Sequence, residues 1–182
     1  YRNMASPQEK QQFDAVFNRI EQASMQMEQT VTTLLALARE EHTRVSKETI
    51  SLLPVIEQSV IDNSRLLQGK DVEVAIDDSC TAQVTVQSGM LKILIDNFIS
   101  NAFQYTDSGQ VTARYAEGEL TIADTGAGIE PEISANITEP AVKGSQSTGY
   151  GFGLSIVKRL CEHQNWQLKV VSEQGTAISV KF

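Results

Sequence analysis

The chain has 182 residues, of which 41% are apolar, so it can bury a hydrophobic core of ordinary size. Its formal charge of -8 argues against a duplex nucleic-acid partner, because proteins that bind a phosphate backbone present a basic face. It has no apolar run of the roughly 18 to 20 residues that span a bilayer, so we expect no direct membrane contact by this chain. Cys80 and Cys161 lack metal-ligand spacing, and we interpret both as buried, unreactive thiols.

The first patterned segment covers residues 13–38. Apolar or small side chains recur there in alternating steps of four and three, at positions 13, 17, 20, 24, 27, 31, 34 and 38. This spacing is typical of the seam of a coiled coil or helical bundle. A helix that stands alone in water cannot bury so narrow an apolar stripe. We expect it to pack against a partner helix, and packing onto the body of its own chain is the alternative.

From residue 46 onward, helices and strands alternate. A helix is predicted over 54–67, with Pro54 in its first turn and Gly69 after its end. Further helices are predicted over 91–105 and 154–163, from apolar positions three and four residues apart. Period-two apolar runs predict strands around 72–76, 84–86, 111–115, 120–122, 168–170 and 178–182. Turns are expected at Glu117 with Gly118 and at Gln174 with Gly175. The order predicts an α/β (α+β) two-layer sandwich, with helices on one face of a mixed sheet.

The helix expected over 91–105 has a polar face as well as an apolar one. Asn97, Asn101 and Gln104 fall at i, i+4 and i+7, on one side of the helix. An amide oxygen that faces a cleft can bind Mg²⁺, which in nucleotide sites takes few protein oxygens together with phosphates and water. Two asparagines four residues apart more often lie on a solvated helix face. Whether they indicate a metal site therefore depends on the motifs that follow.

The strand expected over 120–122 leads into Asp124-Thr125-Gly126-Ala127-Gly128-Ile129. A carboxylate at the end of a strand can accept a hydrogen bond from an exocyclic amine, and the two glycines let a flat base approach the backbone. A β-turn capped by Asp124 is the alternative.

A second glycine-rich segment, Gly149-Tyr150-Gly151-Phe152-Gly153-Leu154, opens the helix expected over 154–163. Backbone amides at the start of a helix, together with the helix dipole, can meet phosphate oxygens. The segment is neither a P-loop, because no Gly-Lys-Ser/Thr follows, nor a Rossmann fingerprint, because no strand precedes it.

In this order the three segments resemble the N box, G1 box and G2 box of the catalytic domain of bacterial sensor histidine kinases. That family belongs to a wider ATPase group with gyrase, heat-shock chaperones and MutL. The resemblance covers about residues 46–182 and rests on the ten residues from Asn97 and on the two hexapeptides above. It implies a domain that binds ATP and Mg²⁺, with Asn101 holding the metal, helped by Asn97, and Asp124 recognising adenine N6.

The resemblance also implies roles for the other residues of these motifs. Tyr105 would lie near the base or ribose, Gly126 and Gly128 would shape the adenine pocket, and a lid would cover about 133–148. The expected nucleotide-binding set is Asn101, Gln104, Tyr105, Asp124, Gly126, Gly128, Ile129, Lys143, Gly149, Gly151, Gly153 and Leu154. Among these, Gly149, Gly151 and Gly153 would flank the triphosphate, and Lys143 would reach the phosphates.

Several positions bear on which reaction such a domain performs. Hydrolytic relatives carry a glutamate where this chain has Asn97, and an amide cannot act as the general base that activates water. The site is therefore suited to phosphoryl transfer, and a hydrolytic ATPase is a weaker alternative. The expected lid lacks the aromatics of the family between Ile137 and Lys143, and Gln104 stands where a cation is common. A degenerate, non-catalytic nucleotide-binding or dimerising adaptor is therefore the main alternative.

The resemblance further implies how the chain is organised. Residues 1–45 look like part of a dimerisation and phosphotransfer hairpin, with its loop and second helix but without the acceptor histidine. Neither His42 nor His163 has the following acidic residue and Thr-Pro of an acceptor. The implied partners are a second copy of the protein, through the hairpin helices, and the receiver domain of a response regulator. The implied location is cytoplasmic, in a parent protein anchored in the bacterial inner membrane.

Overall fold

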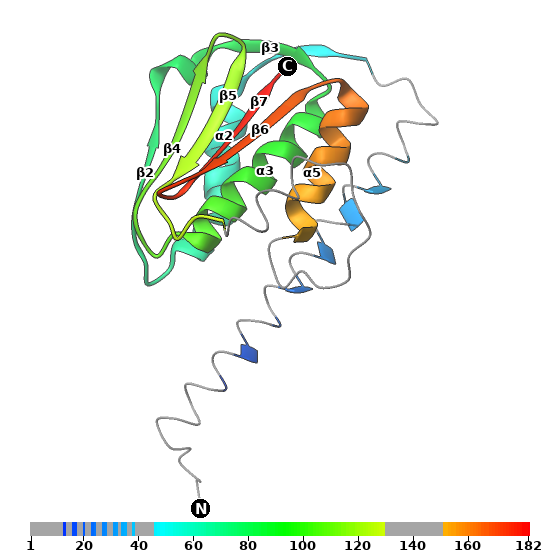
Figure 1. Cartoon of the computed structure of the whole chain (residues 1–182). Helices are drawn as coiled ribbons and strands as arrows, with labels where there is room; N and C mark the ends of the chain where they lie inside the picture. The colour runs from blue at the N-terminus through cyan, green and yellow to red at the C-terminus, as the bar shows by residue number, and fades with distance from the viewer. Residues whose placement is uncertain are drawn as a thin grey trace, which may run out of the picture.

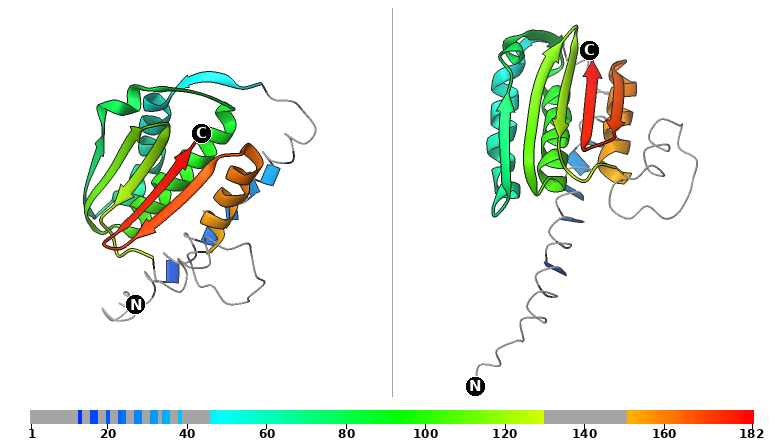
Figure 2. Two further views of the ribbon diagram at one scale, coloured as in Figure 1. Left: turned by 45° about the horizontal axis from the view of Figure 1, so that its top comes forward. Right: turned by 60° about the vertical axis from the view of Figure 1, so that its left-hand side comes forward.

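A computed structural model of the chain describes residues 46–129 and 151–182, together with scattered positions between 13 and 38. Sheet and helices form two layers (Figures 1 and 2). Within the described part, no helix has the length and apolar character needed to cross a membrane.

The elements follow one another closely along the chain. The first are β1 (Glu48–Ser51), helix α2 (Leu52–Asn63), the 3-10 turn η1 (Ser64–Leu67) and β2 (Asp71–Ile76). The 3-10 turn η2 (Asp78–Thr81) and β3 (Gln83–Val86) precede the long helix α3 (Ser88–Tyr105). Then come β4 (Ser108–Ala116), β5 (Glu119–Asp124), α5 (Gly151–Gln164), β6 (Gln167–Ser172) and β7 (Thr176–Lys181).

The main sheet has the strand order β2-β4-β5-β7-β6. Strand β2 pairs with β4 in parallel, whereas the other neighbours are antiparallel, so the predicted mixed sheet is confirmed. Strand β5 is the central strand of this sheet, and Asp124 is its last residue. Asp124 lies opposite Val111 on β4 and opposite Thr176 on β7. The pairing thus brings the end of β5 beside the turn between β6 and β7.

The helices α2, α3 and α5 lie on one face of this sheet (Figures 1 and 2), as predicted. Their apolar sides and the facing side chains of the strands make one core. Helix α3 is at its centre, because it packs against both α2 and α5 and supplies the two largest fully buried side chains, Phe98 and Phe103. Because α3 is packed on several sides, it holds the residues near its C-terminus in fixed positions.

Local details follow from the sequence with a few differences. The predicted hairpin between β4 and β5 is confirmed, and both turn residues, Glu117 and Gly118, have the positive φ that a tight two-residue turn requires. Helix α2 starts two residues before Pro54 and passes into a 3-10 turn after Asn63. Strand β1 was not predicted, and it forms a separate two-stranded sheet with β3.

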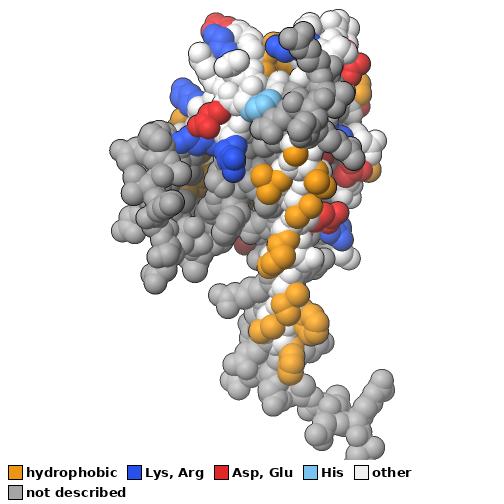
Figure 3. All heavy atoms as spheres, turned by 90° about the vertical axis from the view of Figure 1, so that its right-hand side faces the viewer, with side chains coloured by type: hydrophobic (Ala, Val, Ile, Leu, Met, Phe, Trp, Pro, Cys, Tyr) orange, Lys and Arg blue, Asp and Glu red, His pale blue; other side chains and the backbone are white. Residues whose placement is uncertain are grey.

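The apolar stripe near the N-terminus is partly described. Its described positions have helical backbone, but the residues between them lie outside the described part, so a continuous helix stays a prediction. Eight of the large apolar side chains there are between 45% and 67% exposed and form a row in Figure 3. They are Phe13, Val16, Phe17, Ile20, Met27, Val31, Leu34 and Leu35.

Candidate functional site

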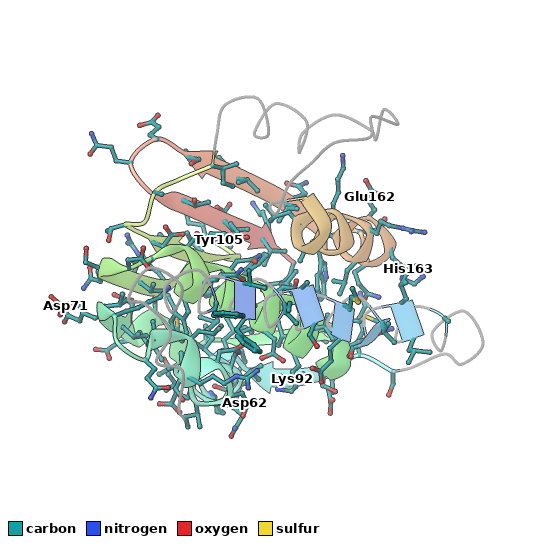
Figure 4. All side chains as sticks on the ribbon, turned by 90° about the horizontal axis from the view of Figure 1, so that it is seen from below. Asp62, Asp71, Lys92, Tyr105, Glu162 and His163 are labelled. Atoms are coloured by element: carbon teal, nitrogen blue, oxygen red, sulfur yellow. The ribbon has the colours of Figure 1, made fainter. Side chains whose placement is uncertain are left out.

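Three elements that carry the predicted motifs converge at one end of the molecule. The C-terminal end of α3, the loop that follows β5 and the first turn of α5 all lie on the lower side of the sheet-and-helix domain in Figure 1. A contact of 3.5 Å between the side chains of Gln164 and Gln87 sets the end of α5 beside the start of α3, so the two helices run in opposite directions. Seen from below, Tyr105 lies near the middle of this end, apart from the ion pair of Asp62 and Lys92 (Figure 4).

The carboxylate of Asp124 is held by two backbone amides. The N–H groups of Gly126 and Thr176 donate to its Oδ1, at 2.9 Å and 3.3 Å. Within the described part of the chain both bonds use the same oxygen, so Oδ2 is the oxygen that can accept from a ligand. Burial raises the pKa of Asp124 above its ordinary value, although the two N–H bonds act to lower it. The group is thus a half-buried acceptor with a fixed orientation, as recognition of an exocyclic amine requires.

Two glycines allow the backbone to pack tightly around Asp124. A Cβ added to Gly126 would overlap the main-chain oxygen of Tyr105 and lie 3.0 Å from Asp124 Oδ1. A Cβ added to Gly175 would overlap the main-chain oxygen of Asp124, and Gly175 also has a φ of +92°. The end of α3, the loop after β5 and the turn before β7 are therefore in direct backbone contact, which only glycine permits at these positions.

The loop after β5 is fastened at both of its ends. At its start, Thr125 N donates to the carbonyl of Gln110, and Thr125 Oγ1 accepts from Gln110 N at 2.9 Å. At its end, Ile129 N donates to Ser172 Oγ at 2.7 Å, and the same hydroxyl donates to the carbonyl of Gly175. Between them, Gly128 has a φ of +76°. This loop therefore has a defined shape, and the bond from Gly126 N to Asp124 Oδ1 is the cap that the alternative interpretation expected.

The polar face of α3 leads to this loop. Asn97 is 1% exposed, and its Nδ2 donates to the carbonyl of Ile93 at 3.0 Å, so its oxygen is the end of the amide that can bind a cation. Asn101, Gln104 and Tyr105 are half-buried. Among the described residues, no cluster of three or more His, Cys, Asp or Glu could hold a metal ion. Amide oxygens on α3 remain the candidate ligands that the sequence indicates.

The third motif is described only in part. Helix α5 begins at Gly151, three residues earlier than predicted, and includes Gly153. Leu154 is buried in the core. Lys143, Gly149 and the expected lid over 133–148 lie outside the described residues.

Several contacts that shape the site were not predicted from the sequence. Thr125, Ser172 and Thr176 hold Asp124 and its loop through contacts with residues 15 to 52 positions away. Lys70 donates hydrogen bonds to main-chain oxygens at the C-terminal end of α3. Such long-range hydrogen bonds follow from the strand order, which the pattern of apolar residues does not specify.

Comparisons with known proteins identify the family and the fold of the chain. Residues 86–182, more than half of the chain, match the family model described as histidine kinase-, DNA gyrase B-, and HSP90-like ATPase. The aerobic respiration control sensor protein ArcB of Escherichia coli (strain K12) is 34% identical over 104 residues, covering 51% of this chain and 13% of ArcB. The phosphate regulon sensor protein PhoR of Pseudomonas aeruginosa is 25% identical over 169 residues, covering 86% of this chain and 38% of PhoR. The chain thus spans well under half the length of these curated relatives.

A solved structure of a mycobacterial sensor histidine kinase, MprB, superposes with a TM-score of 0.57 and 28% identity. The match covers 74% of this chain and 95% of that one. The fold, the order of the motifs and the family model lead to the same assignment. The chain belongs to the histidine kinase-, DNA gyrase B- and HSP90-like ATPase family and contains the ATP-binding catalytic domain of a sensor histidine kinase.

Proposed function

We propose that this domain binds ATP with Mg²⁺ and transfers the γ-phosphoryl group to a histidine, for relay to an aspartate of a response regulator. The observation that carries the proposal is the backbone contact between Tyr105 and Gly126. It joins the polar face of α3 to the loop of Asp124, so that groups suited to an adenine and to a cation lie at one edge of the domain.

In this proposal Asp124 recognises the adenine. Its Oδ2 accepts a hydrogen bond from N6, while Oδ1 stays bonded to the amides of Gly126 and Thr176. Gly126 and Gly128 shape the loop around this carboxylate, because a Cβ at either position would meet main-chain or side-chain atoms of Tyr105, Ser172 or Gly175. Tyr105 lies next to Gly126 through its main chain, and we assign its ring to the base or ribose.

The α3 amides are suited to the phosphate end of the nucleotide. Asn101, with Asn97, would hold Mg²⁺, which when bound neutralises charge on the phosphates. The first turn of α5, with Gly151 and Gly153, offers backbone amides and the positive end of a helix dipole to the same phosphates. We add Gly149 and Lys143 to this set on the strength of the sequence motifs.

Asn97 favours transfer over hydrolysis. An amide cannot take a proton from water, whereas phosphoryl transfer depends mainly on positioning and on charge stabilisation. An acceptor imidazole must then reach the phosphate from outside the domain. His163 does not fit this role, because it lies twelve residues after Gly151 on α5, about 18 Å farther along the helix axis at 1.5 Å per residue.

The remaining assignments concern the organisation of the parent protein. We propose that residues 1–45 are part of a dimerisation hairpin and that residues 46–182 form the catalytic domain. The row of exposed apolar side chains from Phe13 to Leu35 supports a helix that packs in a homodimer. We expect a receiver domain as the downstream partner, and a cytoplasmic location in a parent protein that is anchored in the inner membrane.

Phosphoryl transfer to a supplied hairpin tests the proposal. The acceptor is a first helix with a histidine, the following acidic residue and Thr-Pro, joined to residues 1–45 so that the two halves can pair. With γ-labelled ATP and Mg²⁺, we expect acid-labile, alkali-stable label on the hairpin, and none with the Asp124→Asn or Asn101→Ala variants. ATP binding without labelling would favour the adaptor alternative, and steady phosphate release without labelling would favour a hydrolase.

A further inference from the structure

The ammonium group of Lys70 lies at the C-terminal end of α3. Its Nζ donates to the main-chain oxygens of Phe103, Gln104 and Thr106, at 2.8, 2.9 and 3.1 Å. It also pairs with the carboxylate of Asp107 at 3.2 Å. The side chain of Lys70 is 20% exposed, whereas that of Asp107 is 93% exposed. The three carbonyl bonds are therefore the better-protected interactions of this lysine.

These bonds satisfy groups that the helix itself leaves open. The last carbonyls of an α-helix have no partner within the helix and carry the negative end of its dipole. Many helices end with a left-handed glycine that supplies amide donors, but the residue after α3, Thr106, has an extended conformation. An ammonium has three N–H donors and a positive charge. Lys70 thus supplies hydrogen bonds to two of the last carbonyls of α3 and to the C-cap residue, together with a positive charge at this helix end.

The position of Lys70 is set by the chain around it. Gly69 turns with a φ of +80°, and Lys70 N closes a turn on the carbonyl of Leu67. Asp71 N donates to the carbonyl of Asp107 at 3.1 Å, where the parallel pairing of β2 and β4 begins. The backbone on both sides of Lys70 is thereby tied to the segment that follows α3.

The same helix end forms a wall of the candidate nucleotide site. Tyr105, whose carbonyl packs against Gly126, lies between the carbonyls of Gln104 and Thr106 that Lys70 binds. Gly126 in turn donates to Asp124 Oδ1. A displacement of this last turn of α3 would therefore be transmitted within two contacts to the carboxylate that we assign to adenine recognition.

We propose that Lys70 is a positioning residue of the nucleotide site, acting through the end of α3 rather than by touching the nucleotide. This inference rests on the proposed function, in that it takes the loop of Asp124 as the adenine-binding loop. It assigns to the ammonium group of Lys70 the task of keeping Tyr105 against Gly126.

The test compares Lys70→Met, which keeps the length of the side chain, with Asp107→Asn, which removes only the exposed ion pair. ADP binding is measured by calorimetry on the full chain, and amide shifts of Gly126 and Tyr105 are recorded without nucleotide. We expect Lys70→Met to lose at least about fivefold in ADP affinity, within the range of couplings carried by contact networks, and to shift both amides. Asp107→Asn should stay within about twofold of the parent, in keeping with the small contribution of exposed ion pairs.

Two further variants separate the possible failures. If Lys70→Met does not fold, Lys70→Gln, which keeps amide donors but no charge, is judged by the same criteria. Lys70→Met binding ADP as the parent does, while Asp124→Asn loses affinity, would overturn the role of Lys70 and leave the proposed function intact. A folded parent that does not bind ADP would overturn the proposed function and this inference together. If Lys70→Arg, which keeps a positive charge and N–H donors, binds ADP more tightly than Lys70→Met does, the assigned role is supported.

Discussion

Replacing Gly175 with alanine should destabilise the domain and loosen the site at once. Gly175 has a φ of +92°, and an added Cβ would overlap the carbonyl oxygen of Asp124 and lie 2.9 Å from both the carbonyl carbon of Asp124 and Cα of Thr125. The left-handed conformation costs a residue with a side chain about 1 to 2 kcal/mol. Forcing an extra carbon into a packed region costs about 1 to 3 kcal/mol. We therefore expect the free energy of unfolding to fall by roughly 2 to 5 kcal/mol.

Urea unfolding followed by circular dichroism measures this loss, with Gly118→Ala as the matched control. Gly118 has a similar φ of +82°, but the nearest atom to its added Cβ is Lys181 Cε at 3.9 Å. The control should therefore show the conformational cost alone, about 1 to 2 kcal/mol. Gly175→Ala should also weaken ADP binding, because the displaced backbone precedes the Thr176 amide that bonds Asp124. Equal losses of stability in the two variants would refute the argument from close packing.

Three further predictions follow from burial. Phe98→Ala, at a fully buried position of α3, should lower the free energy of unfolding by about 3 to 5 kcal/mol, and a loss below about 1 kcal/mol in urea unfolding would contradict the packing. Cys80 and Cys161 are buried, and burial raises the pKa of Cys161 to about 12. Both thiols should therefore react with Ellman's reagent only after unfolding, and rapid reaction of the native protein would count against this. Burial raises the folded-state pKa of Asp124 above its ordinary 3.8. The contribution of Asp124 to the free energy of unfolding is therefore present below the unfolded-state pKa and is lost as pH rises through the folded-state pKa. In urea unfolding at a series of pH values, the stability of the parent relative to Asp124→Asn should fall over that window, and a rise would contradict the sign.

Much of the fold could be predicted because its elements carry strong periodic signals. The apolar positions of α3 and the alternation in β4 and β5 led directly to a helix and a hairpin, and the two glycines after Asp124 indicated close approach of the backbone. Strand β1 has no such signal, since it has four residues and no buried position. Its pairing with β3 rather than with the main sheet depends on tertiary packing that a short polar segment does not encode locally.

The candidate site could be predicted in its residues but not in its contacts. The carboxylate of Asp124 was expected to accept from a ligand, yet only the structure assigns Oδ1 to the amides of Gly126 and Thr176. Asn97 was expected on an accessible face, whereas it is buried and bonded to Ile93. The reason is that α3 packs against α2, α5, β5 and η1, so a position that looks polar on a helical wheel can also be enclosed.

A comparison of ATP with ITP tests the central claim, that Asp124 reads the adenine of a bound nucleotide, most directly. The two nucleotides differ at the base edge, where ITP has an oxygen in place of the N6 amine and so presents an acceptor to the carboxylate. Calorimetric titration in Mg²⁺ should give an affinity for ATP at least about tenfold higher than for ITP, since a hydrogen bond to a charged group contributes roughly 1.5 to 3 kcal/mol. The preference should shrink in Asp124→Asn, whose oxygen is held by the two backbone amides and whose nitrogen faces the base. Equal affinities of the folded parent for ATP and ITP would contradict the assignment of Asp124.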